Sequence, residues 1–249
     1  PYVYAVSFSG FYFAMLLVLL ALILRPVGFD YRSKVNNKTW RTIWDYCLFV
    51  SGLVPSLVFG VAIGNVLQGV PFSFDEFMVI DNQIGFFSLF TPFTLLCGLM
   101  SVAMLTTHGA CYLAIKTEGK ILDRTAKVLK IFPIVTIIIF AVGGWFLQFV
   151  ESYHVVNFAG TLAESNPMRK EVSMVMGGWY ENYTKYPWML IAPALAFTGE
   201  LFVLIFSKIK HFGKAFIASG IAILGVISTV GLTLFPFILP SSLNPSASL

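Results

Sequence analysis

Charged side chains are scarce in this sequence: Asp, Glu, Lys and Arg together make up 11% of its 249 residues. Soluble domains carry roughly a quarter, and with 57% hydrophobic residues the composition excludes a soluble chain that carries one anchor. Cysteine is also rare. Cys47, Cys97 and Cys111 are scattered through apolar runs, which excludes a disulfide framework or a cysteine metal site and indicates small buried side chains.

Several patterns typical of enzymes are missing as well. The sequence has no glycine-rich phosphate loop, no paired catalytic carboxylates and no Ser/His/Asp or Cys/His set. From the residues alone, no catalytic centre and no metal site is therefore predicted within this chain.

Long apolar runs dominate instead. A helix needs about 20 apolar residues to cross a bilayer, and six runs meet this length, so the sequence predicts an all-α polytopic transmembrane bundle forming one integral-membrane domain over residues 1–249. The predicted spans are 2–24, 46–67, 86–115, 128–150, 187–206 and 215–235. The third is longer than a bilayer requires, which predicts a tilt or a start in the interface.

The first run stops abruptly. Arg25 introduces a charge, Pro26 cannot continue the helical hydrogen-bond ladder and Gly28 lets the backbone turn. We therefore expect the first span to end at Leu24, which leaves the carboxylate of Asp30 just beyond the membrane.

Basic residues follow alternate spans. The segments 25–41, 116–130 and 208–214 hold 13 of the 16 Lys and Arg residues, whereas the intervening loops are acidic or mixed. Positively charged loops face the cytoplasm, so both ends of the chain are expected on the outer, periplasmic side of a bacterial inner membrane. The net charge of +4 thus indicates orientation and not nucleic-acid binding. Because the chain starts with Pro1 inside an apolar run, we expect it to be a fragment.

The longest loop, 151–185, is rich in aromatic residues. Together with the start of the fifth span it predicts an interfacial aromatic belt. Its members are Trp179, Tyr180, Tyr183, Tyr186 and Trp188.

Two ionisable residues lie inside the apolar runs. Glu200 is an intramembrane carboxylate and thus a functional candidate, but it could also reach Lys208 near the membrane edge or sit neutral against another helix. His108 is the one histidine within a span. A haem held by two histidines would need a second one, so a hydrogen bond to a carbonyl or hydroxyl is favoured over ligation.

Several ordered motifs resemble one known family. Leu24-Arg25-Pro26-Val27-Gly28-Phe29-Asp30-Tyr31-Arg32 is similar to the signature of subunit II of the cytochrome bd-type quinol oxidases. Further matching blocks follow in the same order across the chain. They are Trp40-Arg41, Trp44-Asp45, Gly60-Val61-Ala62, Gly64-Asn65, Gln68-Gly69-Val70-Pro71-Phe72, Asn166-Pro167, Lys170-Glu171-Val172, Phe235-Pro236-Phe237 and Pro240-Ser241-Ser242.

This resemblance implies a fold, a partner and an activity. The family's subunit II has nine helices, of which this chain would lack the first two and the last. It pairs with a subunit I that carries haems b558, b595 and d, and accessory subunits can join them. The complex, a ubiquinol oxidase of the respiratory chain, oxidises quinol and reduces oxygen to water with protons from the cytoplasm. This chain would then hold no haem of its own, with room for a bound quinone or lipid.

The resemblance also assigns candidate residues. Asp30 matches an aspartate on a proton pathway at the subunit interface, although it could equally be a loop carboxylate paired with Arg25 or Arg32. Arg25 and Asp45 match family positions and are motif or interface candidates. His108 stands where some relatives have glutamine, and Glu200 matches no family carboxylate.

A transporter or permease subunit is the alternative from another class, because six spans interrupted by prolines and one buried Glu also describe a permease. A transporter half tends to show paired interrupted segments and a polar site at the midplane. The few scattered polar residues here favour the oxidase subunit.

Overall fold

The computed structural model describes residues 2–158, 168 and 170–249, so the Asn166-Pro167 motif lies outside the described residues. Within them, six helices are long and apolar enough to cross a membrane, which confirms the predicted all-α polytopic bundle. They are α2 (Tyr12–Tyr31), α3 (Lys38–Gln68), α4 (Pro92–Lys116), α5 (Lys120–Phe146) with the 3-10 turn η2 (Leu147–Phe149), α7 (Ile191–Lys208) preceded by η4 (Pro187–Leu190), and α8 (Phe212–Leu234).

The predicted end of the first helix at Leu24 is wrong. The run divides into a short helix α1 (Tyr2–Gly10) and α2, and α2 continues through Arg25 and Pro26 to Tyr31. A proline inside a helix removes one hydrogen bond, and here packing offsets the loss. Gly28 is buried so close to α3 that a Cβ atom on it would lie 2.9 Å from the Leu48 side chain.

Capping side chains decide where two other helices begin. Asn37 accepts a hydrogen bond from the Thr39 amide at 2.9 Å, so α3 begins eight residues before the predicted 46. Thr91 and Thr94 form a capping box, with Pro92 in the first turn, so α4 begins at Pro92 and not at 86. The segment before it contains the 3-10 turn η1 (Phe87–Leu89). Capping side chains accept hydrogen bonds from backbone amides that the start of a helix leaves unpaired. Hydropathy does not detect such caps, so it misplaced the starts of both helices.

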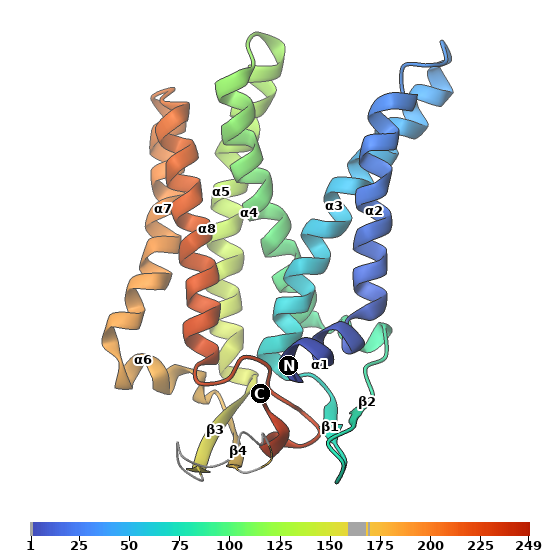
Figure 1. Cartoon of the computed structure of the whole chain (residues 1–249). Helices are drawn as coiled ribbons and strands as arrows, with labels where there is room; N and C mark the ends of the chain where they lie inside the picture. The colour runs from blue at the N-terminus through green and yellow to red at the C-terminus, as the bar shows by residue number, and fades with distance from the viewer. Residues whose placement is uncertain (1, 159–167, 169) are drawn as a thin grey trace.

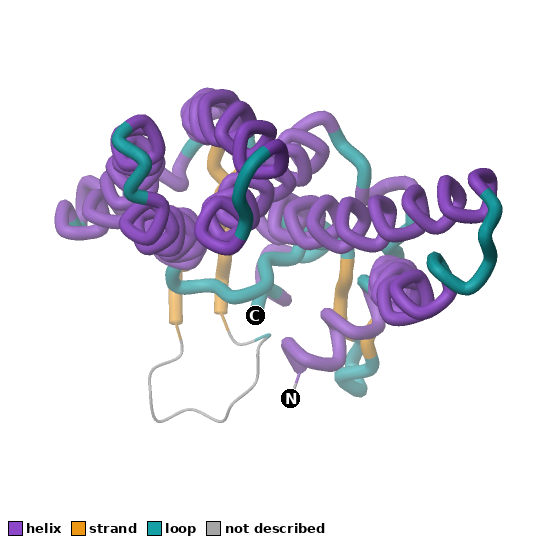
Figure 2. The backbone as a smooth tube through the Cα atoms, turned by 90° about the horizontal axis from the view of Figure 1, so that it is seen from above, coloured by secondary structure: helices purple, strands orange, loops and turns teal. Residues whose placement is uncertain are grey.

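The helices form two groups of unequal size. Helices α4, α5, α7 and α8 pack together, whereas α2 packs on α3. Helix α3 joins the groups by crossing α4, where a Cβ on Gly64 would lie 2.8 Å from the Thr94 Cα. Beyond this crossing, α2 and α3 lean away from the larger group (Figures 1 and 2).

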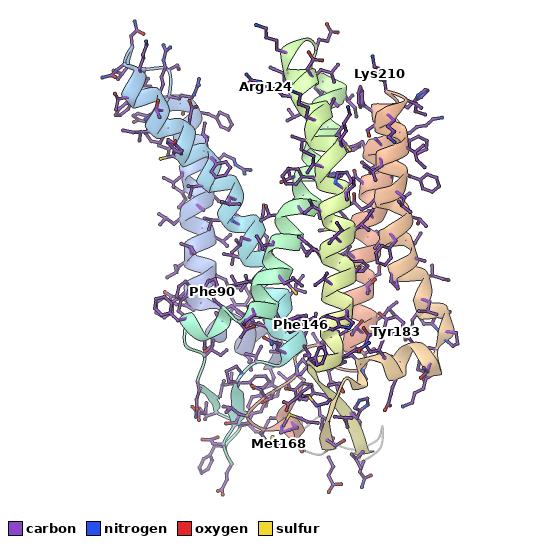
Figure 3. All side chains as sticks on the ribbon, turned by 180° about the vertical axis from the view of Figure 1, so that it is seen from behind. Phe90, Arg124, Phe146, Met168, Tyr183 and Lys210 are labelled. Carbon is purple, nitrogen blue, oxygen red and sulfur yellow. The ribbon has the colours of Figure 1, made fainter. Side chains whose placement is uncertain are left out.

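The connections α2–α3, α4–α5 and α7–α8 lie at one end of the bundle, and both termini lie at the other (Figure 1). Arg124 and Lys210 mark the first end, opposite Met168 and Tyr183 (Figure 3). The basic segments that alternate along the sequence therefore gather in space, as an oriented membrane protein requires.

The opposite end carries two antiparallel hairpins. Strand β1 (Phe72–Phe74) pairs with β2 (Ile80–Asn82), and β3 (Glu151–Phe158) pairs with β4 (Lys170–Met176). The segment predicted as the longest loop thus contains a hairpin, followed by η3 (Gly178–Tyr180) and α6 (Glu181–Lys185). The C-terminal segment with η5 (Pro245–Ala247) reaches the first hairpin through a bridge between Val70 and Ser241.

A small core of aromatic side chains fills this end. Tyr153 and Trp179 are 2% and 1% exposed, and Phe237 packs in the same cluster. The prediction that Trp179 belongs to an interfacial belt is therefore wrong, because the hairpin and the C-terminal segment enclose it. Tyr186 and Trp188 are exposed, as a belt requires.

Candidate functional site at the junction of α2 and α3

Arg32 and Asp45 form a two-point ion pair across the α2–α3 junction. Arg32 Nε donates to Asp45 Oδ1 at 2.6 Å and Nη2 donates to Oδ2 at 3.2 Å. Hydrogen bonding to the carboxylate stabilises the charged guanidinium and raises the pKa of Arg32 above its usual value. Both side chains remain about half exposed, so water and salt screen the pair. Its main effect is geometric, because a planar guanidinium fixes the direction of a carboxylate.

Arg25 also reaches from α2 to α3. Its Nη2 donates to the Ser51 carbonyl at 3.4 Å. Nearer the junction, Trp40 Nε1 donates to the Tyr31 carbonyl at 2.8 Å, one of the carbonyl groups that the end of a helix leaves without an internal partner. These bonds hold the last two turns of α2 against α3.

Asp30 lies in the last turn of α2, between these two arginines in sequence, but pairs with neither. It is exposed, and its side chain has no hydrogen bond or ion pair among the described residues. A carboxylate is unfavourable there, because the last carbonyls give the C-terminal end of a helix a partial negative charge. The structure therefore places an exposed acid, with no partner among the described residues, close in sequence to two cations that are bound elsewhere.

His108 and Glu200 belong to the larger helix group and not to this site. His108 Nδ1 lies 2.8 Å from the Ser219 Oγ of α8, the hydroxyl contact expected of a structural histidine. Glu200 is 3% exposed and has no contact with Lys208 that would form an ion pair. In the described ranges, no group of three or more His, Cys, Asp or Glu side chains could hold a metal ion.

Sequence reasoning missed the partnership of Arg32 with Asp45. The two residues are 13 apart and flank a short connection between two helices, so opposite charges on facing helix ends were the available signal. Ser219 carried no signal, because a serine inside an apolar run is common in membrane helices.

Comparison with known proteins identifies the family. Residues 1–248 match the family model described as cytochrome bd terminal oxidase subunit II. The chain belongs to this family. Among its relatives, "Probable cytochrome oxidase subunit 2" of Haemophilus influenzae is 49% identical over 249 residues. "Cytochrome bd-I ubiquinol oxidase subunit 2" of Escherichia coli K12 is 42% identical over 250 residues.

Coverage differs between the two sides of these alignments. Both cover 100% of this chain but 66% of the relative, so the chain spans about two thirds of the length of these cytochrome bd subunits. "Cytochrome bd ubiquinol oxidase subunit 2" of Bacillus subtilis is 26% identical over 257 residues, which is 98% of this chain and 73% of that protein. Membership of the cytochrome bd family decides against the permease interpretation.

Proposed function

We propose that this chain is part of the non-haem subunit II of a cytochrome bd-type quinol oxidase in the bacterial inner membrane. In this proposal it packs against a haem-bearing subunit I, and the complex oxidises quinol and reduces oxygen to water. Haems b558, b595 and d belong to the partner subunit, and accessory subunits, lipid or quinone complete the assembly. Support comes from the family match over residues 1–248 and from the names of the relatives.

We further propose that Asp30 takes up protons from the cytoplasm for this reaction. The observation that carries the proposal is the free state of its carboxylate. Arg32 is bound at two points by Asp45, and Arg25 is bound by the Ser51 carbonyl. The alternative role of Asp30, as the ion-pair partner of one of these arginines, is therefore disfavoured, because both arginines bind other groups.

The location of Asp30 is suited to proton uptake. The side chain is exposed on this chain in the last turn of α2, and that end of α2 lies where the basic connections gather (Figure 1). Arg32 and Arg25 lie within one and two helical turns of Asp30, but their guanidinium groups are turned to Asp45 and to the Ser51 carbonyl, so the carboxylate is left open to exchange protons. A carboxylate with these neighbours can pass protons between water and a more buried acceptor.

The test is the change Asp30→Asn in the assembled oxidase, with Asp30→Glu beside it. An amide keeps the size but cannot exchange a proton at neutral pH. Turnover per haem should fall at least about tenfold, less than the 10²–10⁴-fold effect of an acid within a reacting site, because water can partly replace a surface group. Asp30→Glu should retain more activity than Asp30→Asn.

Asp123→Asn provides the matched control, because Asp123 is another exposed acid at the same end of the bundle, in the first turn of α5. It should leave turnover per haem unchanged. If turnover per haem is equal in Asp30→Asn and the parent at every pH, the proton-uptake role is refuted.

A further inference from the structure

A groove runs along the contact between α7 and α8. The two helices lie side by side (Figure 1), and the groove between them has a volume of about 360 Å³. Its lining residues extend from Leu195 to Phe206 on α7 and from Lys214 to Ile221 on α8. Apart from the lysine and Thr198, the lining residues are apolar. The groove is therefore an apolar channel that carries one charged side chain.

The groove extends from the basic end of the bundle to about the middle of the membrane. Phe206 lies in the last turn of α7 and Lys214 in the first turn of α8, at the end of the bundle that Arg124 and Lys210 mark (Figure 3). Leu195 lies 11 residues before Phe206 on α7, or ~16 Å along the helix axis. Because the hydrocarbon core of a bilayer is ~30 Å thick, the groove has about the depth of one leaflet.

The walls of the groove away from its charged end suit a hydrocarbon chain. Phe202 and Phe206 stack on each other with 5.7 Å between ring centroids, and Phe202 is about half exposed. Ile217 of α8 is 65% exposed. Thr198 donates its hydroxyl proton to the Ala194 carbonyl at 2.7 Å, so it keeps none for a ligand.

The end of the groove at Lys214 is positively charged. Lys214 is exposed, and it forms no ion pair within the part of the chain that the structure describes. Glu200, the one acid of α7 and α8, is buried, and residues 201–249 contain no Asp or Glu. His211 precedes α8 but donates from Nδ1 to the Ile209 carbonyl at 3.0 Å and makes no capping bond. The partial positive charge of the helix start thus adds to that of the lysine, and an anion is favoured there.

We propose that the groove between α7 and α8 binds an anionic phospholipid, with the phosphate at Lys214 and one acyl chain along the rings of Phe202 and Phe206. The charge favours this lipid over a quinone, whose head group is neutral. The volume is too small for a further helix, which is about 10–12 Å across. This inference goes beyond the proposed function, because it rests only on α7 and α8 as membrane helices.

The experiment is photolabelling of the assembled complex in lipid nanodiscs, followed by mass spectrometry of its peptides, so the readout is independent of turnover. The probes are phosphatidylglycerol and phosphatidylcholine, each with a diazirine in one acyl chain, in a host of phosphatidylcholine. In the parent, phosphatidylglycerol should label the groove peptides about fivefold more than phosphatidylcholine, the effect of one lysine near an anionic lipid. Lys214→Gln should remove this preference.

Matched variants separate the groove from the general charge of the surface. Lys208→Gln removes an exposed charge that does not line the groove, and it should keep the preference. Ile221→Trp narrows the groove and should reduce labelling by both lipids. Ile227→Trp, at an exposed position of α8 outside the groove, should not.

Four outcomes would overturn the proposal. Two are equal labelling of the parent by both lipids and a preference that survives Lys214→Gln. A third is labelling by neither lipid, which would show that another protein surface covers the groove. The fourth is displacement of phosphatidylglycerol by an excess of ubiquinone with a short isoprenoid tail, which would indicate a quinone site.

Discussion

Removing the hydroxyl of Tyr153 should reverse the order of stability between the parent and the variant as pH rises. Tyr153 lies in β3 at the end of the bundle that carries the hairpins, packed between Trp179 and Phe237. Its hydroxyl donates to the Gln68 carbonyl at 3.3 Å. Burial, with a smaller contribution from the Glu151 carboxylate, raises the pKa of Tyr153 from 10.0 to about 12. The change Tyr153→Phe removes the titration and one long hydrogen bond but keeps the ring.

The two effects have different sizes and different pH dependence. Loss of the hydrogen bond costs ~1 kcal/mol at every pH at which the phenol is protonated. The pKa of Tyr153 is higher in the folded state than in the unfolded state. The protonated phenol therefore contributes its full share to the free energy of unfolding below pH 10, and this share is lost as pH rises from about 10 to about 12. The full difference corresponds to roughly 3 kcal/mol. Tyr153→Phe should thus be less stable than the parent below pH 10 and more stable near pH 12.

The assay is thermal unfolding in detergent at intervals from pH 8 to 12, followed by tryptophan fluorescence, since Trp179 adjoins the ring. For a chain of this size, 1 kcal/mol moves the unfolding midpoint by about 2–4 °C. Tyr186→Phe, which changes an exposed tyrosine at the same end, should follow the parent throughout. A parallel decline of the parent and Tyr153→Phe from pH 10 to 12 would refute the reasoning.

Two other predictions concern a turn and the orientation. Gly69→Ala should destabilise the protein by at least ~2 kcal/mol, because φ is +87° and the methyl group would overlap the Tyr153 hydroxyl. Gly220→Ala, in open space on α8, should be neutral or stabilising in the same unfolding assay. A single cysteine at Lys120 should resist an impermeant thiol reagent in intact cells, whereas one at Glu76 should react. The reverse pattern would contradict the proposed orientation.

The number and type of the membrane helices could be predicted from the sequence, because hydropathy depends on composition over about 20 residues. The ends of the helices could not. Pro26 and Gly28 favour a helix end in local terms, but Gly28 is the residue that lets α2 pack on Leu48. Burial of Trp179 could not be predicted either, because Phe237, which packs in the same cluster, is far away in the sequence.

The candidate site also had one part that the sequence could predict and one part that it could not. Proximity of Arg25, Asp30 and Asp45 could be predicted because all three flank one short connection. Which arginine binds which acid depends on side-chain geometry. From the sequence Arg32 could have paired with Asp30, whereas in the structure it binds Asp45. The contact between His108 and Ser219 was beyond prediction, because it joins α4 to α8 through a serine with no distinguishing pattern.

Helix α3 lies so close to α4 at Gly60 and Gly64 that any tilt of α3 must pivot about these two glycines. A Cβ on Gly60 would lie 2.7 Å from the Gly98 Cα of α4, so the two backbones have almost no freedom to slide there. Asp45 lies 15 residues from Gly60 along the same helix, a lever arm of ~22 Å. Each degree by which α3 tilts about the glycines therefore moves Asp45 by ~0.4 Å, and Arg32 and the end of α2 move with it. A tilt of about five degrees would carry Asp30 ~2 Å relative to α4 and α5, so the position of the acid in the membrane is set by two glycines near the other end of the helix.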